Sequence, residues 1–466
     1  MPDTSASPAH DARPAETYDE AEQALLSRWP ETKLDPTLER AEAFTRLLGD
    51  PQHAYPVIHL TGTNGKTTTA RMVDALIRGF GLRTGRFTSP HVESMTERIS
   101  IDGEPLTQAQ FVHAYNDVAS YTHLVDRDPD NASGHPLSFF ETVVGMAYSA
   151  FADAPVDVAV VEVGMGGAWD ATNVADGTVS VVLPISVDHA SHLGDRPEDI
   201  AVEKAGIIKS GATVIMAQQS PGVAAVVLER TAEMGATVVR EGAEFGVVHR
   251  LPAVGGQMLH LQGLRGEYDE VFLPLYGAHQ AQNASVALAT VEAFLGEDTL
   301  DAAIVREAFA QVTSPGRLEI IRRSPTIVLD AAHNPHGAAA TADALRDSFM
   351  FSPLIGVVGV MADKDYHGVL EAFEPVLSEI VCTQNSTNRA MDAEELGEVA
   401  RGIFGVDRVH VARRLEDAID RAATLAEDGS VRGEAIGSGG VLITGSVITA
   451  GEARAMLKPR DSGASS

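Results

Sequence analysis

The stretch from Thr61 to Thr69 carries the residue types of a phosphate-binding loop. It reads Thr-Gly-Thr-Asn-Gly-Lys-Thr-Thr-Thr, with an apolar run before it at 55–60 and a helix-like segment after it at 70–77. Gly62 and Gly65 allow the backbone to turn tightly and to bring its N–H groups close to an anion. The N-terminus of the following helix adds N–H donors and a partial positive charge. This order of strand, loop and helix predicts that the segment binds the phosphates of a nucleotide.

Two side chains of this loop have specific predicted tasks. Lys66 is placed to reach the terminal phosphates, and the hydroxyl of Thr67 is placed to ligate Mg²⁺. The loop is more compact than the standard nucleotide-binding pattern, which has a glycine where Leu60 stands. The alternative is a plain Gly-Asn turn followed by a chance Lys-Thr pair, and the flanking strand and helix argue against it.

Polar residues at the ends of other predicted strands are further candidate ligands. Glu162 directly follows the apolar run 158–161, and Asp188-His189 follows the next strand. Ligands gather at the carboxyl ends of strands in open α/β sheets, so Glu162 is placed to meet Mg²⁺ beside the loop. A surface acid is the alternative for Glu162, and an ordinary loop residue is the alternative for His189. Lys204 lies among apolar residues, and physical reasoning alone favours a surface lysine whose stem covers apolar neighbours.

A second series of strand ends, beyond residue 315, also carries polar residues. The stretch Asp330 to His336 ends one strand with an acid and a histidine before a helix, and 363–365, Asp-Lys-Asp, follows the next strand. Polar clusters at strand ends in both series predict a ligand cleft between two domains. Taken alone, residues 363–365 are equally consistent with a solvated turn.

The strands and helices that must position these side chains alternate along the chain. Runs such as 156–161 and 179–185 are short, valine-rich and nearly continuous, as is typical of parallel strands buried on both faces. The segments 141–151 and 281–295 have the length and spacing of helices. From about 237 to 276, short alternating runs between glycines predict antiparallel hairpins in a smaller subregion. The strands expected in the second series are 326–330, 354–360 and 440–446.

We therefore expect an α/β protein with two domains. The N-terminal one should contain a P-loop-type, mainly parallel sheet, and the smaller C-terminal one should be a Rossmann-like α/β domain. We place the ATP-binding domain at 18–315 and the second domain at 316–458. Residues 1–17, rich in Ala, Pro, Asp and Ser, and residues 459–466 are expected to be disordered tails.

Composition restricts the class of partner. The 466 residues carry a formal net charge of −30, which disfavours nucleic acid and anionic membranes as partners. The single cysteine, Cys382, excludes an internal disulfide and a cysteine-based zinc cluster, and it fits a reducing compartment. No apolar run has the length needed to span a membrane, and no secretory signal is evident. We therefore expect a cytoplasmic protein.

Taken in order, the motifs resemble the folylpolyglutamate synthase/dihydrofolate synthase family of the Mur-ligase superfamily of ATP-dependent amide-bond ligases. The resemblance covers nearly the whole chain between the tails, and the stretches 88–91, Thr-Ser-Pro-His, and 170–173, Asp-Ala-Thr-Asn, point to the folate branch. The matching segments are 62–67, 88–91, 97–99, 140–142, 162–167, 170–173, 188–189, 203–209, 279–280 with 283, 315–317 and 330–335.

The resemblance implies a reaction and a set of small-molecule partners. ATP would phosphorylate a carboxylate of a folate, and L-glutamate would then displace the phosphate; use of dihydropteroate stays open. One Mg²⁺ would be held by Thr67, Glu162 and Ser89. A second would sit near His189 and Lys204, with Lys204 carbamylated. A monomer is implied as well.

The resemblance also implies roles for individual residues. Lys66, Lys204 and His333 would be catalytic, with His333 a candidate base for the attacking amine. Nucleotide contacts are implied for Gly62, Thr63, Asn64, Gly65, Lys66, Thr67, Thr68, Asn283, Arg317 and Asp330. Folate contacts are implied for Ser89, Pro90, His91, Phe140, Asp170 and Ala171, and glutamate contacts for His333 and Ser446.

Two departures from the family pattern are visible. The arginine that usually follows the paired glycines is replaced by Ala168 and then Trp169, so its contact is lost or supplied elsewhere and pterin specificity is open. The usual Asp-Gly-Ala-His is Asp330-Ala331-Ala332-His333, which retains the acid and the histidine.

Two alternatives compete with the folate enzyme. A cell-wall Mur ligase shares the loop and the chemistry, but it would need an additional N-terminal domain for a uridine nucleotide, which is not obvious here. A non-catalytic nucleotide switch would leave the clusters at His189, Lys204 and Asp330 without a task. Release of ADP that requires both a folate and glutamate separates a ligase from a switch.

Overall fold

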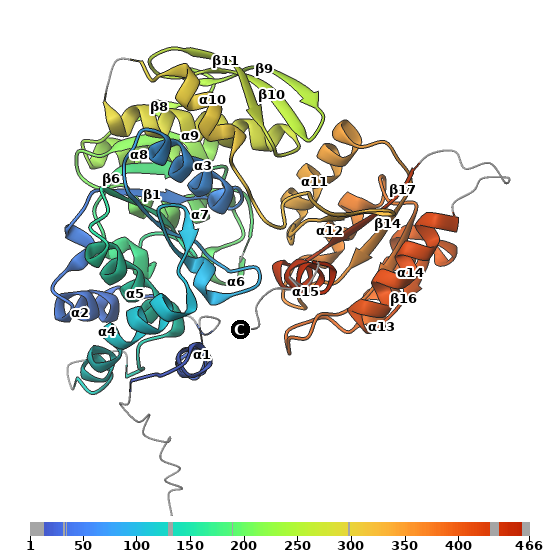
Figure 1. Ribbon diagram of the computed structural model, residues 1–466, viewed down its shortest axis with the longest axis horizontal. Coiled ribbons are helices and arrows are strands. Elements are labelled where there is room, and N and C mark those ends of the chain that lie inside the picture. Colours follow the sequence, from blue (N-terminus) through green and yellow to red (C-terminus); the bar gives the residue numbers. More distant parts are fainter. Residues whose placement is uncertain are drawn as a thin grey trace, which may run out of the picture.

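Two α/β lobes, each built on its own sheet, make up the protein (Figure 1). This computed structural model describes residues 14–30, 33, 35–128, 134–188, 190–296, 299–428 and 438–458. The first lobe holds an eight-stranded sheet in the order β4-β3-β2-β5-β1-β6-β7-β8, and the second holds a six-stranded sheet in the order β12-β13-β17-β14-β15-β16. The mixed α/β class and the mainly parallel first sheet confirm the predicted fold.

The first sheet is parallel from β2 to β8, and the β2–β3 and β3–β4 pairings at one edge are antiparallel. Its central strands are buried on both faces, as their valine-rich runs predict. The strands are β1 (Val57–Thr61), β2 (Thr84–Phe87), β3 (Ile99–Ile101), β4 (Glu104–Pro105), β5 (Val158–Glu162), β6 (Gly177–Val182), β7 (Thr213–Met216) and β8 (Thr237–Arg240).

Helices cover both faces of this sheet, and two of the core clusters that they bury meet at β5. Alternate residues of β5 divide between them: Val158 and Val160 join the core under α3 and α9, and Ala159 and Val161 join the core under α4 and α5. The helices are α1 (Tyr18–Leu26), α2 (Glu39–Leu47), α3 (Lys66–Gly79), α4 (Gln108–Asp126), α5 (Phe139–Asp153), α6 (Ala190–Leu193), α7 (Pro197–Lys204), α8 (Pro221–Glu233), α9 (Ala278–Leu295) and α10 (Ala302–Ala310).

A small antiparallel sheet of β9 (Gly246–Ala253), β10 (Gly256–Gln262) and β11 (Glu267–Leu273) packs on the α9 side of the first lobe. It confirms the hairpins predicted in the region 237–276, with one difference. Residues 237–240 form β8, which pairs in parallel with β7 and closes the main sheet. A short edge strand has no sequence feature that separates it from a hairpin strand.

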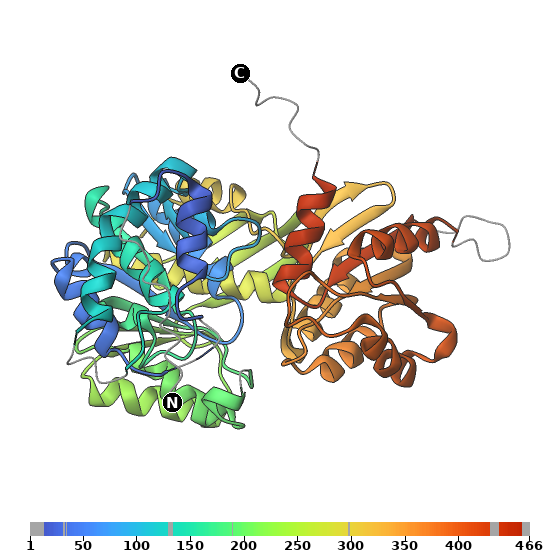
Figure 2. The same cartoon turned by 90° about the horizontal axis from the view of Figure 1, so that it is seen from below.

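The second lobe has a parallel sheet edged by one antiparallel strand, β12. Its strands are β12 (Glu319–Arg323), β13 (Thr326–Leu329), β14 (Phe351–Val358), β15 (Glu379–Cys382), β16 (Val409–Val411) and β17 (Ser438–Thr444). Its helices are α11 (Pro335–Ser348), α12 (Tyr366–Phe373), α13 (Ala393–Phe404), α14 (Leu415–Asp428) and α15 (Val447–Leu457). Figure 2 shows α15 on the side of this lobe that faces the first lobe.

Two expectations about the chain ends can be compared with the structure only in part. Residues 1–13 and 459–466 lie outside the described residues. Residues 14–17, which the sequence assigned to the N-terminal tail, are held against α4: the backbone of Ala15 exchanges hydrogen bonds with the side chain of Asn116 at 2.8 and 2.9 Å. Among the described residues, no helix is both long enough and apolar enough to cross a membrane.

Candidate active site

The loop that follows β1 forms the floor of the candidate site. Gly65 has φ +86° and directly precedes α3, which begins at Lys66. A side chain at Gly65 would place its Cβ 2.7 Å from Oδ1 of Asn283 on α9, so the loop and α9 approach as closely as glycine allows. The backbone N–H groups at the start of α3 are thereby presented in a confined space, as phosphate binding requires.

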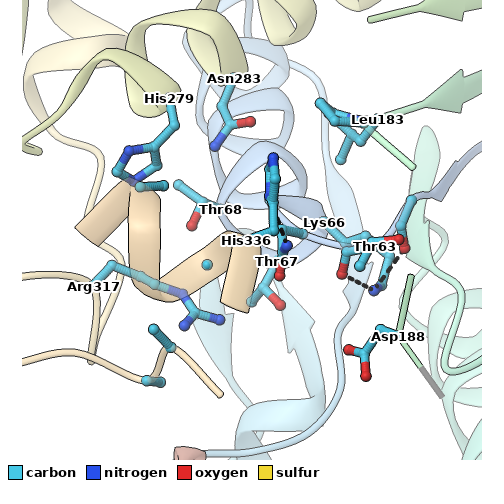
Figure 3. A pocket seen from close by; sticks show the side chains of 18 of the residues that line it. Thr63, Lys66, Thr67, Thr68, Leu183, Asp188, His279, Asn283, Arg317 and His336 are labelled. Atoms are coloured by element: carbon cyan, nitrogen blue, oxygen red, sulfur yellow. Dashed lines mark hydrogen bonds between the residues drawn. The ribbon is translucent and has the colours of Figure 1, made fainter. Parts of the chain in front are cut away.

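Lys66 and Thr67 lie at the centre of this floor (Figure 3). The Lys66 ammonium donates to the carbonyl oxygens of Gly62 and Thr63, at 3.1 and 3.3 Å, and so stays folded over the loop. The hydroxyl of Thr67 lies 3.0 and 2.9 Å from the two carboxylate oxygens of Glu162. The structure thus places the side chains of Lys66 and Thr67, at the start of α3, near that of Glu162, at the end of β5.

Glu162 is a buried carboxylate at the end of β5, with 2% of its surface exposed. Burial raises its pKa, and this effect is opposed by the charge of Lys66, the Thr67 hydrogen bond and the backbone N–H of Ser89. The Ser89 N–H donates to the carboxylate at 3.2 Å. A buried acid with these donors, and with no directly bonded cation in the described part of the chain, is suited to hold a metal ion.

Lys204, at the end of α7, is the most perturbed base of the site. Only 4% of its surface is exposed, and the ammonium has no hydrogen-bond partner among the residues that the structure describes. Burial lowers the pKa of Lys204 to about 7, and the charge of Lys66 contributes in the same direction. The surface lysine favoured by physical reasoning alone is therefore wrong, because the whole side chain is covered. Perturbation of this kind is characteristic of functional sites.

The second lobe closes the nucleotide side of the site with two charged residues. Arg317 follows the junction between the lobes, and Figure 3 shows its guanidinium directed into the cavity toward Thr67. Asp330, at the end of β13, is held by the N–H groups of Leu318 and Ala332, at 3.0 and 2.9 Å, and by the Thr341 hydroxyl at 2.8 Å. Burial raises the pKa of Asp330, and Arg317 opposes that rise.

A polar network around Asp188 crosses from one lobe to the other. Its carboxylate accepts hydrogen bonds from Lys364 at 2.6 Å and from Asn334 at 3.1 Å. The amides of Asn64 and Asn334 bond reciprocally, at 3.3 and 3.1 Å, which links the phosphate loop to the start of α11. His333 Nδ1 lies 3.0 Å from the carbonyl of Ala331, and its Nε2 lies 3.7 Å from Asp188.

Two adjoining cavities lie between these groups. The smaller, of about 220 Å³, is lined by every residue predicted to contact the nucleotide, from Gly62 to Thr68 together with Asn283, Arg317 and Asp330. The larger, of about 980 Å³, lies between the lobes. Ser89, Pro90, Gly164, Met165, Asp188, His333, His336 and Val447 line both. A nucleotide in the first cavity would thus meet a molecule in the second at these residues.

The residues predicted to contact a folate lie in the wall of the larger cavity, with one exception. Ser89, Pro90, Phe140, Asp170 and Ala171 line it. His91 lies a step behind, where its Nδ1 accepts a hydrogen bond from Arg98 at 3.0 Å, and Arg98 is the residue that lines the cavity.

The residues predicted to contact glutamate lie at the second-lobe side of the same cavity. His333 and Ser446 both line it. The hydroxyl of Ser446 accepts the N–H of Ile448 at 3.1 Å and so caps α15.

Asp170 has a more structural position than its predicted role suggests. Its carboxylate accepts from the backbone and hydroxyl of Thr172, at 3.0 and 2.5 Å, and from the N–H of Met165 at 2.9 Å. It therefore shapes the glycine-rich turn at 164–170 in addition to lining the cavity, and its contact with a folate stays a prediction.

Sequence reasoning missed several residues, and one predicted ligand is not described. Glu203 accepts the backbone N–H groups of Gly167 and Trp169, at 3.3 and 3.1 Å, and so fixes the same turn. Trp29, which follows α1, and Arg40 on α2 line the larger cavity, and no motif marks them. His189 lies outside the described residues.

Known proteins resemble this chain over almost its full length. Residues 316–446 match the family described as Mur ligase, glutamate ligase domain. A dihydrofolate synthase/folylpolyglutamate synthase of Mycobacterium tuberculosis is 50% identical over 454 residues, which are 94% of this chain and 93% of that protein. Two solved structures are similar throughout. M. tuberculosis folylpolyglutamate synthase complexed with ADP has TM-score 0.91 and 49% identity, with 95% and 98% of the two chains covered. E. coli FolC in complex with DHPP and ADP has TM-score 0.82 and 27% identity, with 96% and 99% covered.

Proposed function

This chain belongs to the dihydrofolate synthase/folylpolyglutamate synthase family, and from that membership we infer that it is an ATP-dependent ligase of L-glutamate to folates. The observation that carries this function is the meeting of two cavities at Ser89, Pro90 and His333, one built for phosphates and one large enough for a pterin-linked acid. The family decides against the cell-wall ligase and the nucleotide switch.

The nucleotide would bind in the smaller cavity. Its phosphates would lie on the N–H groups of the 62–67 loop, and Lys66 would exchange its two carbonyl partners for phosphate oxygens. Arg317 would approach the terminal phosphate from the second lobe. The solved relative with ADP supports nucleotide binding as such, and the roles of the single residues are our proposal.

The residues present fit a magnesium ion beside the loop. The Thr67 hydroxyl and the Glu162 carboxylate are oxygen donors 2.9 Å apart, and oxygen donors are what Mg²⁺ prefers. Ser89 brings a third oxygen to the same edge of the sheet. Bound there, Mg²⁺ would neutralise charge that develops on the phosphates.

The reaction needs positioning more than covalent help from the protein. A carboxylate of the folate attacks the terminal phosphorus of ATP, ADP leaves, and an acyl phosphate results. The amine of glutamate then attacks the acyl carbon, and inorganic phosphate leaves. Lys66 and Arg317 would hold the phosphoryl group against the anionic carboxylate, whose repulsion is the main obstacle.

The attacking amine must lose a proton, and we propose that His333 accepts it. With Nδ1–H donating to the Ala331 carbonyl, Nε2 is left as the acceptor. Asp188, 3.7 Å from Nε2, would stabilise the imidazolium that forms. Ser446 would lie on the glutamate side of the same cavity.

We also propose that Lys204 is carbamylated. A lysine with pKa of about 7 is substantially neutral at physiological pH, and a neutral amine reacts with CO₂ to give a carbamate and one proton. The product is an oxygen donor suited to a second Mg²⁺ with His189. Burial and the charge of Lys66 outweigh the opposing carboxylates of Asp170, Asp188 and Glu203 and so favour the neutral amine, which supports the reaction with CO₂.

Three broader features complete the proposal. The ATP-binding and glutamate-ligase domains would span 18–315 and 316–458. A monomer is proposed from the family resemblance. The lone cysteine, Cys382, is buried and unpaired, which supports a cytoplasmic location.

A substrate panel tests the function. Purified protein receives ATP, Mg²⁺ and labelled glutamate with either tetrahydrofolate or dihydropteroate, and the products are resolved by mass. We expect the folate to gain one glutamate with one ADP formed per bond. Product from dihydropteroate would extend the activity to dihydrofolate synthesis. Absence of product from both acceptors would overturn the proposal.

A further inference from the structure

The loop between β2 and the turn at 95–98 separates the two cavities. We call residues 88–94 the partition loop. Ser89 and Pro90 line both cavities, and the N–H of Ser89 is bonded to Glu162. Whatever fixes this loop therefore fixes the wall at which a nucleotide and an acid would meet.

Glu97 makes the partition loop a rigid unit. Its carboxylate accepts the backbone N–H groups of Val92, Glu93 and Ser94, at 2.9, 3.0 and 3.0 Å. Three charge-assisted hydrogen bonds to consecutive residues leave the loop little freedom to bend internally. Glu97 therefore holds the half of the loop that carries Glu93, and a shift of Glu93 would displace the backbone that leads to Ser89.

One face of α15, in the second lobe, packs against the partition loop. Val447, Gly451, Arg454 and Lys458 follow at spacings of four, three and four, which places them on one stripe of the helix. A methyl group at Gly451 would overlap the carbonyl oxygen of Val92, so the helix touches the loop backbone where only glycine fits. Val447, at the start of the stripe, lines both cavities.

Ion pairs between charged side chains stabilise this contact between α15 and the partition loop. Glu93 on the partition loop pairs with Arg454 and with Lys458, the latter at 3.0 Å. The same Arg454 binds Glu319 of β12, with its Nε 2.9 Å from both carboxylate oxygens. Lys458 and Arg454 together hold the pKa of Glu93 below its usual range. Arg454 is 15% exposed and Glu93 26%, so the pair is partly withdrawn from water.

We propose that Glu93 and Arg454 are positioning residues that lock the partition loop to α15 and so keep the junction of the two cavities closed while the acyl phosphate exists. This inference depends on the proposed ligase function. Water that reached the acyl phosphate would return the carboxylate and release phosphate, so ATP would be spent without a new bond. If the loop is loosened, more ATP should therefore be consumed than ligated product is formed.

The test measures ADP and ligated product in the same reaction for Glu93→Gln and Arg454→Gln. We expect the ratio of ADP to product, near one in the wild type, to rise at least about threefold, with kcat/KM for the folate falling about three- to tenfold. The effect of the double variant should be smaller than the two single effects combined, since the Glu93–Arg454 pair is lost in both, while Lys458 and Glu319 each lose a separate partner. Gly451→Ala, which displaces the loop by bulk and not by charge, should show the same excess of ADP.

A matched control separates this role from ordinary stabilisation. Glu374 pairs with Arg408 at 2.7 Å wholly within the second lobe, as a more exposed Glu–Arg pair remote from the partition loop, so Glu374→Gln should leave the ratio at one. Thermal melts of all variants identify any that fail to fold. A ratio of one in both Glu93→Gln and Gly451→Ala, or a raised ratio in Glu374→Gln, would overturn the inference. An inactive wild type would instead refute the ligase function itself.

Discussion

Replacing Lys204 with methionine should make the protein more stable while it abolishes ligation. Methionine has nearly the same length and no charge, and the site it would fill is 4% exposed. The pKa of Lys204 is about 7 in the folded chain instead of 10.5. At about 1.4 kcal/mol for each tenfold change, this corresponds to roughly 5 kcal/mol of unfavourable charging below pH 7. The wild type bears that cost because the amine is needed for function.

The lowered pKa of Lys204 also determines how the stability difference between the wild type and Lys204→Met changes with pH. Because the pKa of Lys204 is lowered on folding, unfolding takes up a proton between pH 7 and 10.5, and the stability of the wild type rises with pH through that window. The advantage of Lys204→Met should be largest below pH 7 and should shrink to about 1.4 kcal/mol near pH 9.5.

Urea denaturation followed by tryptophan fluorescence measures this difference. The two tryptophans, Trp29 and Trp169, both belong to the first lobe, so the signal reports the lobe that holds Lys204. Buffers free of Mg²⁺ and depleted of CO₂ keep the side chain an amine. A variant that is no more stable than the wild type at pH 6, or an advantage that does not shrink at higher pH, would refute the reasoning.

Three further substitutions test the site. Lys66→Ala should lower glutamate ligation by about 10³-fold with an unchanged circular dichroism spectrum, because a phosphate-binding charge is lost and no packing changes; full activity would remove Lys66 from the site. Glu162→Gln should raise the Mg²⁺ concentration for half-maximal rate about 10- to 100-fold, since an anionic oxygen partner of Thr67 is lost, and an unchanged Mg²⁺ titration would count against that role. Lys204→Ala should lose activity and regain part of it with added short carboxylates, which replace the carbamate oxygens; wild-type rates without any additive would contradict carbamylation.

The sequence alone was sufficient to place the site residues whose position follows from adjacent segments of the chain. The loop at 62–67 lies between a strand and a helix that are contiguous with it, so its position needed no tertiary information. Glu162 could be placed because the carboxyl ends of parallel strands share an edge, and the structure joins it to Thr67. The resemblance to a family then grouped residues of both lobes around one cavity.

The burial of a side chain, and contacts between residues that are distant in the sequence, could not be predicted in this way. Whether apolar neighbours cover only the stem of Lys204 or the whole side chain depends on the turn at 164–170 packing over α7, which no local pattern encodes. Asp170 lines the larger cavity, and no local pattern indicates that its oxygens also accept hydrogen bonds from Thr172 and Met165. Glu93 and Arg454 are 361 residues apart, and only the folded lobes bring them together.

Transfer of oxygen from substrate to phosphate tests the central claim most directly. The claim is that ATP phosphorylates the carboxylate of the folate at the junction of the two cavities, beside Lys66 and Glu162. Folate labelled with ¹⁸O in that carboxylate is turned over with ATP and glutamate, and the phosphate released is analysed by mass spectrometry. We predict one ¹⁸O atom in each phosphate molecule. Phosphate without the label, formed together with ligated product, would contradict the acyl-phosphate route.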